Sequence, residues 1–371
     1  MKYYLIAGEA SGDLHASNLV KHLIKVDNQA HIRAWGGDLL QKQGAEIVKN
    51  YKDLAFMGFV EVASHLKTIL SNIRFCKNDI LSFQPDVVIL VDYPGFNLRI
   101  AKFLHKKNIR VFYYISPQIW AWHTSRVKQI KRYIDEVFVI LPFEQAFYAK
   151  YGIKAHYLGH PLLDVVKQAE IDDDFRKNNG FGEEPIIALL PGSRKQEIEN
   201  MLPIMLKAKK HIKGYRFVIA GVEHHKPLYA LLCKDNSVQI IYNQTYSLLA
   251  NSFAAMVTSG TATLETALFN VPQVVCYKGN YFSYLIAKHL IKNIKYISLV
   301  NLIADAEVVV ELIQKEMNEQ KLSMQLKRII EDETYREFML NKYKELQHML
   351  GEGSASELIA RKMAACLKAI K

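Results

Sequence analysis

Cysteine is scarce in this sequence of 371 residues. The four cysteines lie far apart and form no C-x-x-C pair: Cys76, Cys233, Cys276 and Cys366. This spacing suggests neither a zinc site nor a disulfide framework. We therefore expect a reduced, cytoplasmic protein.

Long apolar runs are also missing. No stretch approaches the roughly 18 apolar residues that a membrane-spanning helix needs. The first residues, MKYYLIAGEASGD, hold only a short apolar run before Glu9, which is too short for the core of a signal peptide. We expect any contact with a membrane to be made at its surface.

Two common phosphate-binding signatures do not occur. The spacing from Gly8 to Gly12 misses the G-x-G-x-x-G fingerprint, and there is no G-x-x-x-x-G-K-[ST] sequence. An NAD site and a P-loop kinase or ATPase are therefore not expected. A recognisable nucleic-acid module is missing too, although the net charge of +11 would suit nucleic acid, an anionic membrane surface or phosphorylated substrates. A merely basic surface is the alternative.

Short apolar runs, rich in β-branched residues, alternate with amphipathic stretches along most of the chain. This alternation predicts an α/β fold whose parallel sheets are covered by helices on both faces. The expected strands are YYLIAG, DVVILVDYPG, RVFYYISP, EVFVILP, IIALLPG, YRFVIAG, VQIIY, AAMVTSG and PQVVCYK, with helices such as ASNLVKHLIK and NLRIAKFLHKK between them. The length favours two domains.

A polar, charged stretch at residues 167–185 divides the chain into two similar α/β units. Beyond about residue 305 the pattern changes again, and we expect helices with no strand between them.

Three glycine-containing turns follow expected strands and open expected helices. Such turns let the backbone approach a ligand, and the N-terminus of a helix favours anions. The candidate binding residues in the first turn are Gly8, Ser11, Gly12 and Asp13; in the second, Gly192, Ser193 and Arg194; in the third, Ser259, Gly260, Thr261 and Glu265. For the first turn, a tight strand-to-helix connection without a ligand is the alternative.

The second turn carries the strongest signal. Ser193 is placed to cap the following helix, and Ser193 and Gln196 have capping-box spacing. Arg194 adds a fork of donors that matches phosphate oxygens. In the third turn, small hydroxyl residues suit a diphosphate, and Glu265 could accept from a ribose diol. The alternative for the second turn is an ordinary capped helix whose arginine points to solvent. For the third turn it is a Ser/Thr-rich cap, with Glu265 as a first-turn acid stabilised by the helix dipole.

A candidate base, Asp92, stands at the carboxyl end of an expected buried strand, just before a Pro-Gly turn. A carboxylate there can point into a cleft and take a proton from a substrate hydroxyl. Gln118, Trp120 and Trp122 could line a sugar or lipid pocket. The alternatives are a turn cap for Asp92 and packing for the tryptophans.

Residues 56–75 have apolar side chains at helical spacing, with basic residues beside them. An interfacial helix has this pattern, and so does an ordinary core helix. The candidate membrane or acyl contacts are Val60, Leu66 and Leu70.

In this order, the motifs closely resemble those of the lipid-A-disaccharide synthases. The motifs are AGEASGD, MGFVEV, SPQIWAW, LLPGSRKQEI and SGTATLETAL, and the resemblance runs to about YISLVNLIAD. Each motif is modestly specific, whereas the ordered set is highly specific. The tail resembles the family only as helices.

The resemblance implies a GT-B fold: two Rossmann-like domains with parallel sheets, a cleft between them, and C-terminal helices. We place the N-terminal domain, on the acceptor and membrane side, at 1–166 and the UDP-sugar domain at 167–345. The remaining helix, at 346–371, is a candidate for one that crosses back to the first domain.

The resemblance further implies an inverting transfer of 2,3-diacylglucosamine from its UDP derivative to 2,3-diacylglucosamine 1-phosphate. The products are the lipid A disaccharide 1-phosphate and UDP. The family works at the cytoplasmic face of the inner membrane of Gram-negative bacteria, which implies a peripheral protein. We predict no cofactor, no metal ion and no nucleic-acid partner; a homodimer stays open.

Carried over residue by residue, the family's catalytic aspartate falls on Asp92 and its phosphate-binding arginine on Arg194. The turn with Glu265 matches the nucleotide loop, and Asn301 matches another position near the nucleotide. Gly95 stands where family members commonly have a second acid, so the role of base rests on Asp92. The alternatives are another GT-B UDP-sugar enzyme, such as a UDP-sugar epimerase, or a basic peripheral membrane or nucleic-acid-binding protein.

Overall fold

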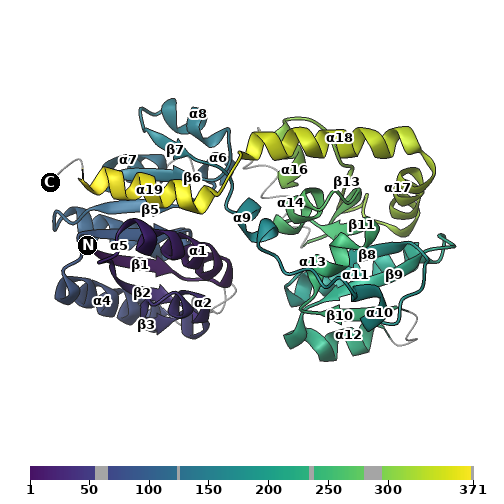
Figure 1. The fold of residues 1–371 in the computed structure, drawn as a ribbon, viewed down its shortest axis with the longest axis horizontal. Coiled ribbons are helices and arrows are strands. Elements are labelled where there is room, and N and C mark those ends of the chain that lie inside the picture. Colours follow the sequence, from purple (N-terminus) through teal and green to yellow (C-terminus); the bar gives the residue numbers. More distant parts are fainter. Residues whose placement is uncertain (55–65, 123–125, 234–237, 280–294, 369–371) are drawn as a thin grey trace. The chain divides into compact units, whose positions relative to one another are not determined.

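The structure, a computed structural model, describes residues 1–54, 66–122, 126–233, 238–279 and 295–368. The chain forms two compact units (Figure 1). Unit 1 comprises Met1–Asp164 together with Leu350–Lys371, and unit 2 comprises Val165–Met349. Unit 1 therefore includes the C-terminal segment, and the chain passes between the units twice.

Unit 1 contains a seven-stranded parallel sheet in the order β3-β2-β1-β4-β5-β6-β7. Its strands are β1 (Lys2–Ala7), β2 (His31–Gly36), β3 (Glu46–Asn50), β4 (Val87–Val91), β5 (Val111–Tyr114), β6 (Glu136–Val139) and β7 (Ala155–Tyr157). The chain order reverses between β1 and β4. In open α/β sheets, ligands bind beyond the carboxyl ends of the strands at such a switch point.

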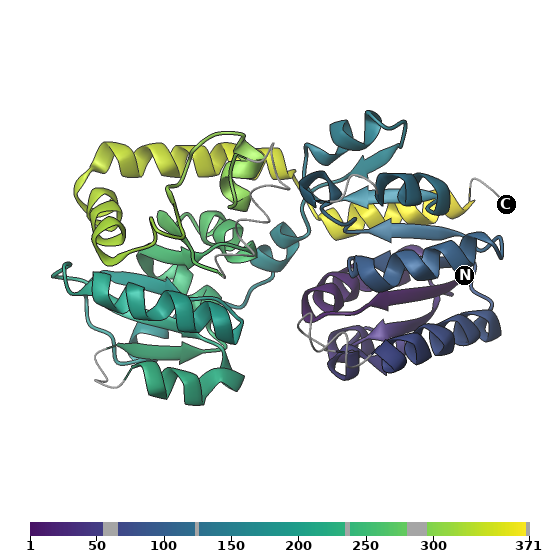
Figure 2. The ribbon, with the colours of Figure 1, turned by 180° about the vertical axis from the view of Figure 1, so that it is seen from behind.

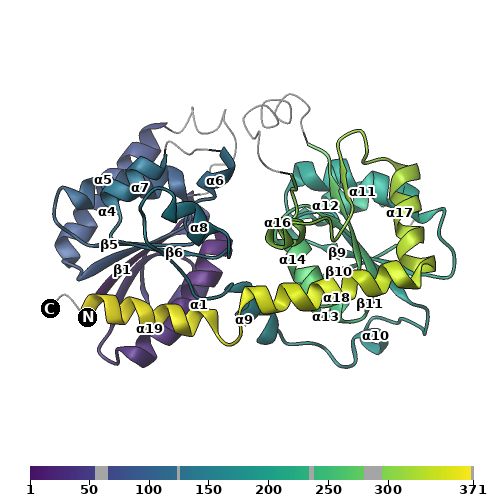
Figure 3. The same ribbon diagram turned by 90° about the horizontal axis from the view of Figure 1, so that it is seen from above.

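Helices cover both faces of this sheet. They are α1 (Ala10–Val26), α2 (Asp38–Lys42), α4 (Leu66–Phe83), α5 (Pro94–His105), α6 (Ile119–Trp122), α7 (Val127–Tyr133), α8 (Glu144–Ala149), α9 (Leu162–Lys167), which spans the unit boundary, and α19 (Ala355–Lys368), with a 3-10 turn at Tyr51–Leu54. Tyr4 and Ile6 of β1 pack with α4 and α5, whereas Tyr3 and Leu5 pack with α1 and α19 (Figure 3). Burial of both faces explains why the strands are almost continuously apolar.

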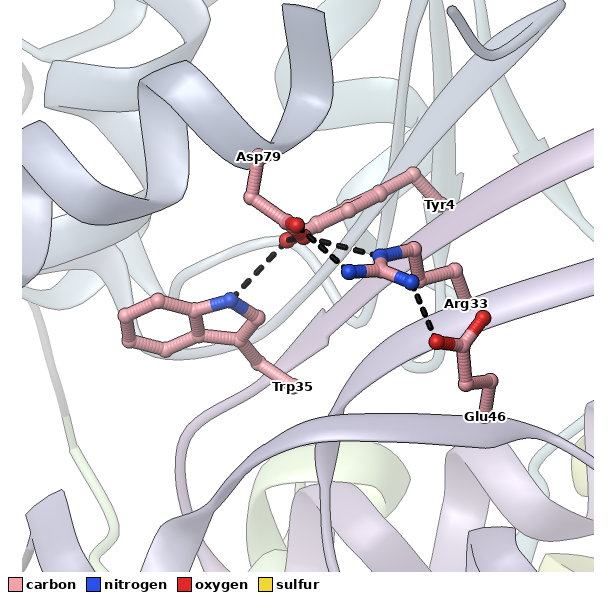
Figure 4. A network of polar contacts seen from close by, with 5 residues as sticks. All are labelled: Tyr4, Arg33, Trp35, Glu46 and Asp79. Carbon is pink, nitrogen blue, oxygen red and sulfur yellow. Dashed lines mark hydrogen bonds and ion pairs between the residues drawn. The ribbon is translucent and has the colours of Figure 1, made fainter. Parts of the chain in front are cut away.

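A polar network fastens α4 to the sheet (Figure 4). Asp79 of α4 accepts hydrogen bonds from the Tyr4 hydroxyl at 2.7 Å and from Nε and Nη2 of Arg33 at 3.0 and 2.6 Å. Trp35 donates to the same hydroxyl at 2.9 Å, and Arg33 also pairs with Glu46. The residues come from β1, β2, β3 and α4, so the network fixes the orientation of the helix.

Unit 2 repeats the same topology. Its six parallel strands have the order β10-β9-β8-β11-β12-β13, and the chain order reverses between β8 and β11. They are β8 (Ile186–Leu190), β9 (Arg216–Gly221), β10 (Gln239–Tyr242), β11 (Ser252–Thr258), β12 (Gln273–Tyr277) and β13 (Glu311–Ile313). The two parallel-sheet units confirm the predicted α/β, Rossmann-like fold class.

The helices of unit 2 follow the strands in the expected alternation. They are α10 (Phe175–Asn178), α11 (Lys195–Lys209), α12 (Lys226–Leu232), α13 (Thr245–Ala250), α14 (Thr261–Leu268), α16 (Leu299–Ala304), α17 (Glu319–Glu331) and α18 (Glu333–Leu350), with a 3-10 turn at Glu223–His225. Figures 1 and 2 show α18, in yellow-green, running along unit 2 before the chain reaches α19.

The expectation of a tail without strands was wrong. Residues 311–313 form β13, which pairs with β12 in parallel, with Val275 opposite Glu311. The preceding residues Val308 and Val309 are buried. A β-branched run this short is compatible with a strand or a helix. It forms a strand here because β12 provides a hydrogen-bonding partner along its edge.

The last helix, α19, packs against α1 within unit 1. The backbone N–H of Ser356 donates to Asp164 at 2.7 Å, and the N–H of His160 donates to the carbonyl of Leu350 at 3.0 Å. Both passages of the chain between the units are thus tied together inside unit 1. None of the described helices combines the length and apolar character that crossing a membrane would require.

Candidate functional site

Asp92 follows β4 at the switch point of unit 1. Asp92 and Tyr93 both have left-handed backbones, with φ of 45° and 49°. Such conformations are uncommon outside glycine and persist only where surrounding contacts enforce them. Here the carbonyl of Asp92 accepts hydrogen bonds from Asn97 Nδ2 and from the Tyr113 hydroxyl, each at 2.7 Å. These hydrogen bonds hold the backbone of the turn that carries Asp92.

Asp92 is one of the residues that line a cavity of about 350 Å³. Ile115, which follows β5, contributes a second wall with φ of 56°, an outlier for a β-branched residue. The lining is Asp92, Pro94, Ile115, Ser116, Pro117, Gln118, Ile119, Arg126 and Ile140. Gln118 is thus found beside Asp92 as the sequence suggested. Arg126 was missed, because it reads as the beginning of a surface helix.

Burial raises the pKa of Asp92 to about 6, and the negative charge of Glu9 adds to the rise. A hydrogen bond from the Tyr93 backbone acts in the opposite direction. A carboxylate with this pKa is ionised near neutral pH and is more basic than an exposed aspartate. Like Arg126, Glu9 was not among the predicted site residues.

The turn after β1 lies next to Asp92 in the sheet. A Cβ on Gly8 would lie 2.4 Å from Cδ1 of Tyr93, so this position admits only glycine while the Tyr93 ring is in place. Gly12 is buried, and Ser11 is exposed in the first turn of α1. Of these three residues, Gly8 is in contact with the Asp92 turn, through the Tyr93 ring.

Asp13 has a structural role instead of the ligand contact that we expected. Its carboxylate accepts from the backbone N–H of Gly37 at 2.7 Å, of Leu39 at 3.1 Å and of Leu40 at 3.3 Å. These donors form the N-terminus of α2, and Asp13 is buried. The carboxylate is therefore occupied in fixing α2 to α1.

Glu144 binds the backbone of Ile140, which lines the same cavity, and was also missed. This buried carboxylate accepts from the N–H groups of Leu141 and Ile140 at 2.9 and 3.2 Å and from Trp120 Nε1 at 3.2 Å. Burial raises its pKa to about 7 despite these hydrogen bonds. Trp120 therefore anchors Glu144 and has a packing role. Packing was one of the two interpretations that the sequence allowed for this residue.

In unit 2, the turn after β8 differs in detail from the prediction. The N-cap of α11 is Arg194, with an extended backbone, rather than Ser193. Glu197 accepts from the N–H of Ser193 at 3.0 Å and of Arg194 at 3.2 Å, so it takes the role that we had given to Gln196. Gly192 has φ of 108° and lies against Glu197, which requires glycine there. The capping prediction was wrong by one residue.

The Arg194 side chain is 68% exposed. Its nearest acidic partner is Glu197, whose Oε1 lies 3.5 Å from Nη1. A guanidinium held this loosely at the N-terminus of a helix is available to a phosphate.

The turn after β11 starts beside the Arg194 turn, because Val257 of β11 is paired with Leu190 of β8. Ser259 is partly buried and donates to the carbonyl of Ile297 at 3.1 Å, while Gly260 and Thr261 are exposed at the N-terminus of α14. The structure therefore brings the second and third predicted turns together at the switch point of unit 2.

Glu265 of α14 lines a cavity of about 600 Å³ in unit 2. It accepts a hydrogen bond from the Tyr246 hydroxyl at 2.7 Å, and burial raises its pKa. Glu170 and Asp172 share the lining. Three carboxyl groups repel a diphosphate, so this cavity suits neutral hydroxyl and amide groups.

Asn301 is buried and has no hydrogen-bonding group to offer a nucleotide. Its Oδ1 accepts from the N–H of Val308 and Val309 at 2.8 and 3.0 Å. Its Nδ2 donates to the carbonyl of Val309 at 2.8 Å and to Glu311 at 2.9 Å. Asn301 thus supports the segment whose Ile297 carbonyl holds Ser259, and its expected nucleotide contact becomes an indirect role.

The candidate membrane contacts fall at the edge of the described chain. Val60 lies outside the described residues, and α4 begins at Leu66, whose side chain is also outside them. Leu70 is 55% exposed. The adjacent, core-facing side of α4 carries Ile73 and Cys76, which are buried.

Comparison with known proteins gives a consistent result. A family model described as lipid-A-disaccharide synthetase matches residues 3–363. A lipid-A-disaccharide synthase from Syntrophus aciditrophicus is 39% identical over 368 residues, which is 96% of this chain and 95% of that protein. The protein of the same name from Nitrosococcus oceani is 36% identical over 98% of this chain and 96% of its own length.

Solved structures share the fold at low identity. A UDP-GlcNAc 2-epimerase from Neisseria meningitidis bound to UDP-GlcNAc has a TM-score of 0.71 and 15% identity, covering 98% of this chain and 100% of its own. A glycotransferase of kitacinnamycin has a TM-score of 0.68 and 13% identity, with 99% of each chain covered. At these identities the likeness shows the architecture and not the reaction.

Proposed function

The chain belongs to the lipid-A-disaccharide synthetase family, and from this premise we propose how its two units divide the work of the reaction. It is a glycosyltransferase of lipid A biosynthesis. The observation that carries this conclusion is the match to the family over residues 3–363, with relatives of 34–39% identity covering almost the whole chain.

The substrates that we propose are UDP-2,3-diacylglucosamine as donor and 2,3-diacylglucosamine 1-phosphate as acceptor. The 6-hydroxyl of the acceptor attacks the anomeric carbon of the donor with inversion. The products are the β-1′,6-linked disaccharide 1-phosphate and UDP.

Asp92 is the proposed general base. Its raised pKa, its place at the end of β4 and the cavity in front of it support this role. The carboxylate takes the proton of the attacking hydroxyl as the new bond forms, so the nucleophile never has to exist as a free alkoxide. Charge then develops on the donor sugar as in glycoside cleavage. Arg126 lines the same cavity and supplies a cation for the phosphate of the acceptor.

Unit 2 is the proposed nucleotide side. The departing UDP gathers negative charge on its diphosphate, which the Arg194 guanidinium and the N-termini of α11 and α14 stabilise. Loss of one such donor commonly costs on the order of 3 kcal/mol of transition-state stabilisation. The cavity of Glu265 and Tyr246 suits the ribose and base of the same nucleotide, because those groups are neutral.

We also propose that the protein binds the cytoplasmic surface of the inner membrane. The substrates carry acyl chains, and the exposed side of α4 combines Leu70 with the exposed basic residues Lys67 and Arg74. Apolar and basic groups together favour an anionic lipid surface.

The direct test is incubation of the purified protein with both acylated substrates, with release of UDP and formation of disaccharide measured together. We expect both products, and no turnover when the donor is UDP-GlcNAc, which has no acyl chains. Disaccharide formed equally well from unacylated sugars, or conversion of UDP-GlcNAc to its 2-epimer, would contradict the proposal.

A further inference from the structure

Three side chains of different chemistry meet at one place in unit 1, away from the Asp92 cavity. Glu136 is the first residue of β6, His156 is the middle residue of β7, and Cys366 lies near the end of α19. Nε2 of His156 is 2.6 Å from Oε2 of Glu136. Potential ligand atoms of the three residues all lie within 4.8 Å of one another.

The environment of these residues is protected. His156 and Cys366 are buried, and the Glu136 side chain is 25% exposed. Strand pairing fixes the two sheet residues, because Val137 is paired with Ala155 and Phe138 with His156. The third residue is fixed by α19, whose Met363 and Leu367 are buried in the core beside it. The cluster is therefore held by three packed elements.

An imidazole nitrogen, a thiolate sulfur and a carboxylate oxygen are the ligand types that Zn²⁺ takes in proteins. The thiolate and carboxylate together balance the charge of a divalent ion, which leaves a neutral site. A neutral site is favourable here, because the positive charges of Lys154 and Lys362 act on the Cys366 thiol and would oppose a site with a net positive charge.

We propose that Glu136, His156 and Cys366 bind a zinc-class divalent ion, with water completing a tetrahedral site. The ion would join the end of α19 to the β6–β7 edge of the sheet, and so fasten the C-terminal helix to unit 1. It is separate from the glycosyl transfer, because the three residues are not among those that line the Asp92 cavity.

Binding requires three local changes. The thiol gives up its proton to solvent as the sulfur–metal bond forms. The proton that Nε2 of His156 donates to Glu136 moves to Nδ1 of the same ring or to solvent, which frees the Nε2 lone pair for the metal. The His156–Glu136 pair also opens from 2.6 Å to about 3.3 Å, the separation that two ligands at tetrahedral distances from zinc adopt. Glu136 is a long side chain that is partly exposed, so it can make this movement without a change in the strands.

The spacing of the cysteines along the chain predicts no zinc site. A single cysteine far from its partners along the chain gives no such signal. Only the parallel pairing of β6 with β7 and the return of α19 to unit 1 bring the three residues together.

The test uses the full-length, tag-free protein after treatment with chelator, titrated with Co²⁺ and then with Zn²⁺. We expect one equivalent of Co²⁺ to produce a sulfur-to-cobalt charge-transfer band, which Zn²⁺ then abolishes. Cys366→Ser should remove the band, and Cys233→Ser, which changes a buried cysteine of unit 2, should keep it. His156→Gln should weaken binding more than about 10-fold, since even outer-shell partners are worth that much.

UDP release should be unchanged in all three variants when their folding is verified by circular dichroism. If Cys366→Ser does not fold, the His156→Gln titration decides. A wild-type protein without the band, a band that survives in Cys366→Ser, or full affinity in His156→Gln would overturn the proposal. Binding through other groups, such as the adjacent His224 and His225, would show as affinity without the band.

Discussion

At the scale of single residues, the Asp92 turn shows how backbone and chemistry are linked. A left-handed aspartate and a left-handed tyrosine in succession are held by hydrogen bonds to the Asp92 carbonyl and by the close contact of the Tyr93 ring with Gly8. Strain of this kind persists where the surrounding structure over-determines it, and it clusters at functional sites. The same turn buries the carboxyl group enough to raise its pKa.

The pH dependence of the reaction should report this pKa. Asp92 must be ionised to accept a proton, so kcat/KM should rise with pH on a limb centred near pH 6 in the free enzyme. Glu9→Gln removes a nearby negative charge and should move the limb to lower pH. Glu183→Gln, which changes an exposed carboxylate of unit 2, should leave it in place. Initial rates at low substrate concentration from pH 4.5 to 8 measure both; an unmoved limb in Glu9→Gln would remove Glu9 from this account.

The stability of the fold should depend on pH in the opposite direction to kcat/KM. Because the pKa of Asp92 is raised from 3.8 to about 6 in the folded state, the folded protein holds this proton more tightly than the unfolded chain does. Its contribution to stability is therefore complete below about pH 3.8 and is lost as the pH rises through about 6. Burial of the Asp92 carboxyl group thus disfavours the folded state at the pH values where the proposed base is ionised.

Single residues also show the limit of prediction from sequence. Asp92 and Gly192 could be recognised because the adjacent strand and turn residues reveal their setting. Asp13 and Asn301 belong to equally conspicuous motifs, yet their hydrogen-bonding atoms are taken by backbone groups of other loops. Arg126 carried no local signal, because only the fold brings it into the lining of the Asp92 cavity. Glu144 accepts from N–H groups three and four residues before it, and its contact with Trp120 depends on the fold.

At the scale of elements, α4 combines two roles on different faces. Its buried face contains Ile73, Cys76 and Ile80 in the core, and Asp79 joins the network of Figure 4. Its exposed face contains Leu70 with basic neighbours. The sequence allowed either a core helix or an interfacial helix. The described part of α4 packs into the core on one side, and its other side is exposed and available to a membrane surface.

Paired substitutions on α4 separate the two roles. Leu70→Ser should change the free energy of unfolding by no more than about 0.5 kcal/mol, as expected for an exposed site, and should weaken binding to vesicles that contain anionic lipid. Ile73→Ser removes a buried side chain and should cost about 3 kcal/mol or more. Urea unfolding and vesicle sedimentation measure these effects. Undiminished vesicle binding by Leu70→Ser would contradict the membrane role of this face.

Strands were predicted best where both faces are buried. The central strands β1, β4, β5, β8 and β11 are continuous apolar runs and were found from the sequence. β2 and β3 were not predicted, because Arg33 in the middle of β2 and Lys49 in β3 interrupt their apolar runs. β7 and β13 are three residues long, and such short edge strands form only because a neighbouring strand provides a partner.

At the scale of the whole molecule, the chain repeats one topology and gives each copy different groups. Both sheets reverse their strand order between the first and fourth strands of the unit. Unit 1 places a carboxylate of raised pKa at its switch point, and unit 2 places Arg194 and two helix N-termini at its own. The predicted domain limits of 1–166 and 167–345 compare with Met1–Asp164 and Val165–Met349 for the compact units, the first of which also takes in the C-terminal segment.

The central claim is that unit 1 supplies the base and unit 2 binds the nucleotide, and a comparison of two variants tests it most directly. For Asp92→Asn and Arg194→Ala, UDP affinity is measured by calorimetry and turnover by disaccharide formation. The account predicts wild-type UDP affinity with turnover lowered by orders of magnitude in Asp92→Asn, and both quantities impaired in Arg194→Ala, whose transition-state loss should be on the order of 3 kcal/mol. Near-normal turnover in Asp92→Asn, or unchanged UDP affinity and turnover in Arg194→Ala, would contradict it.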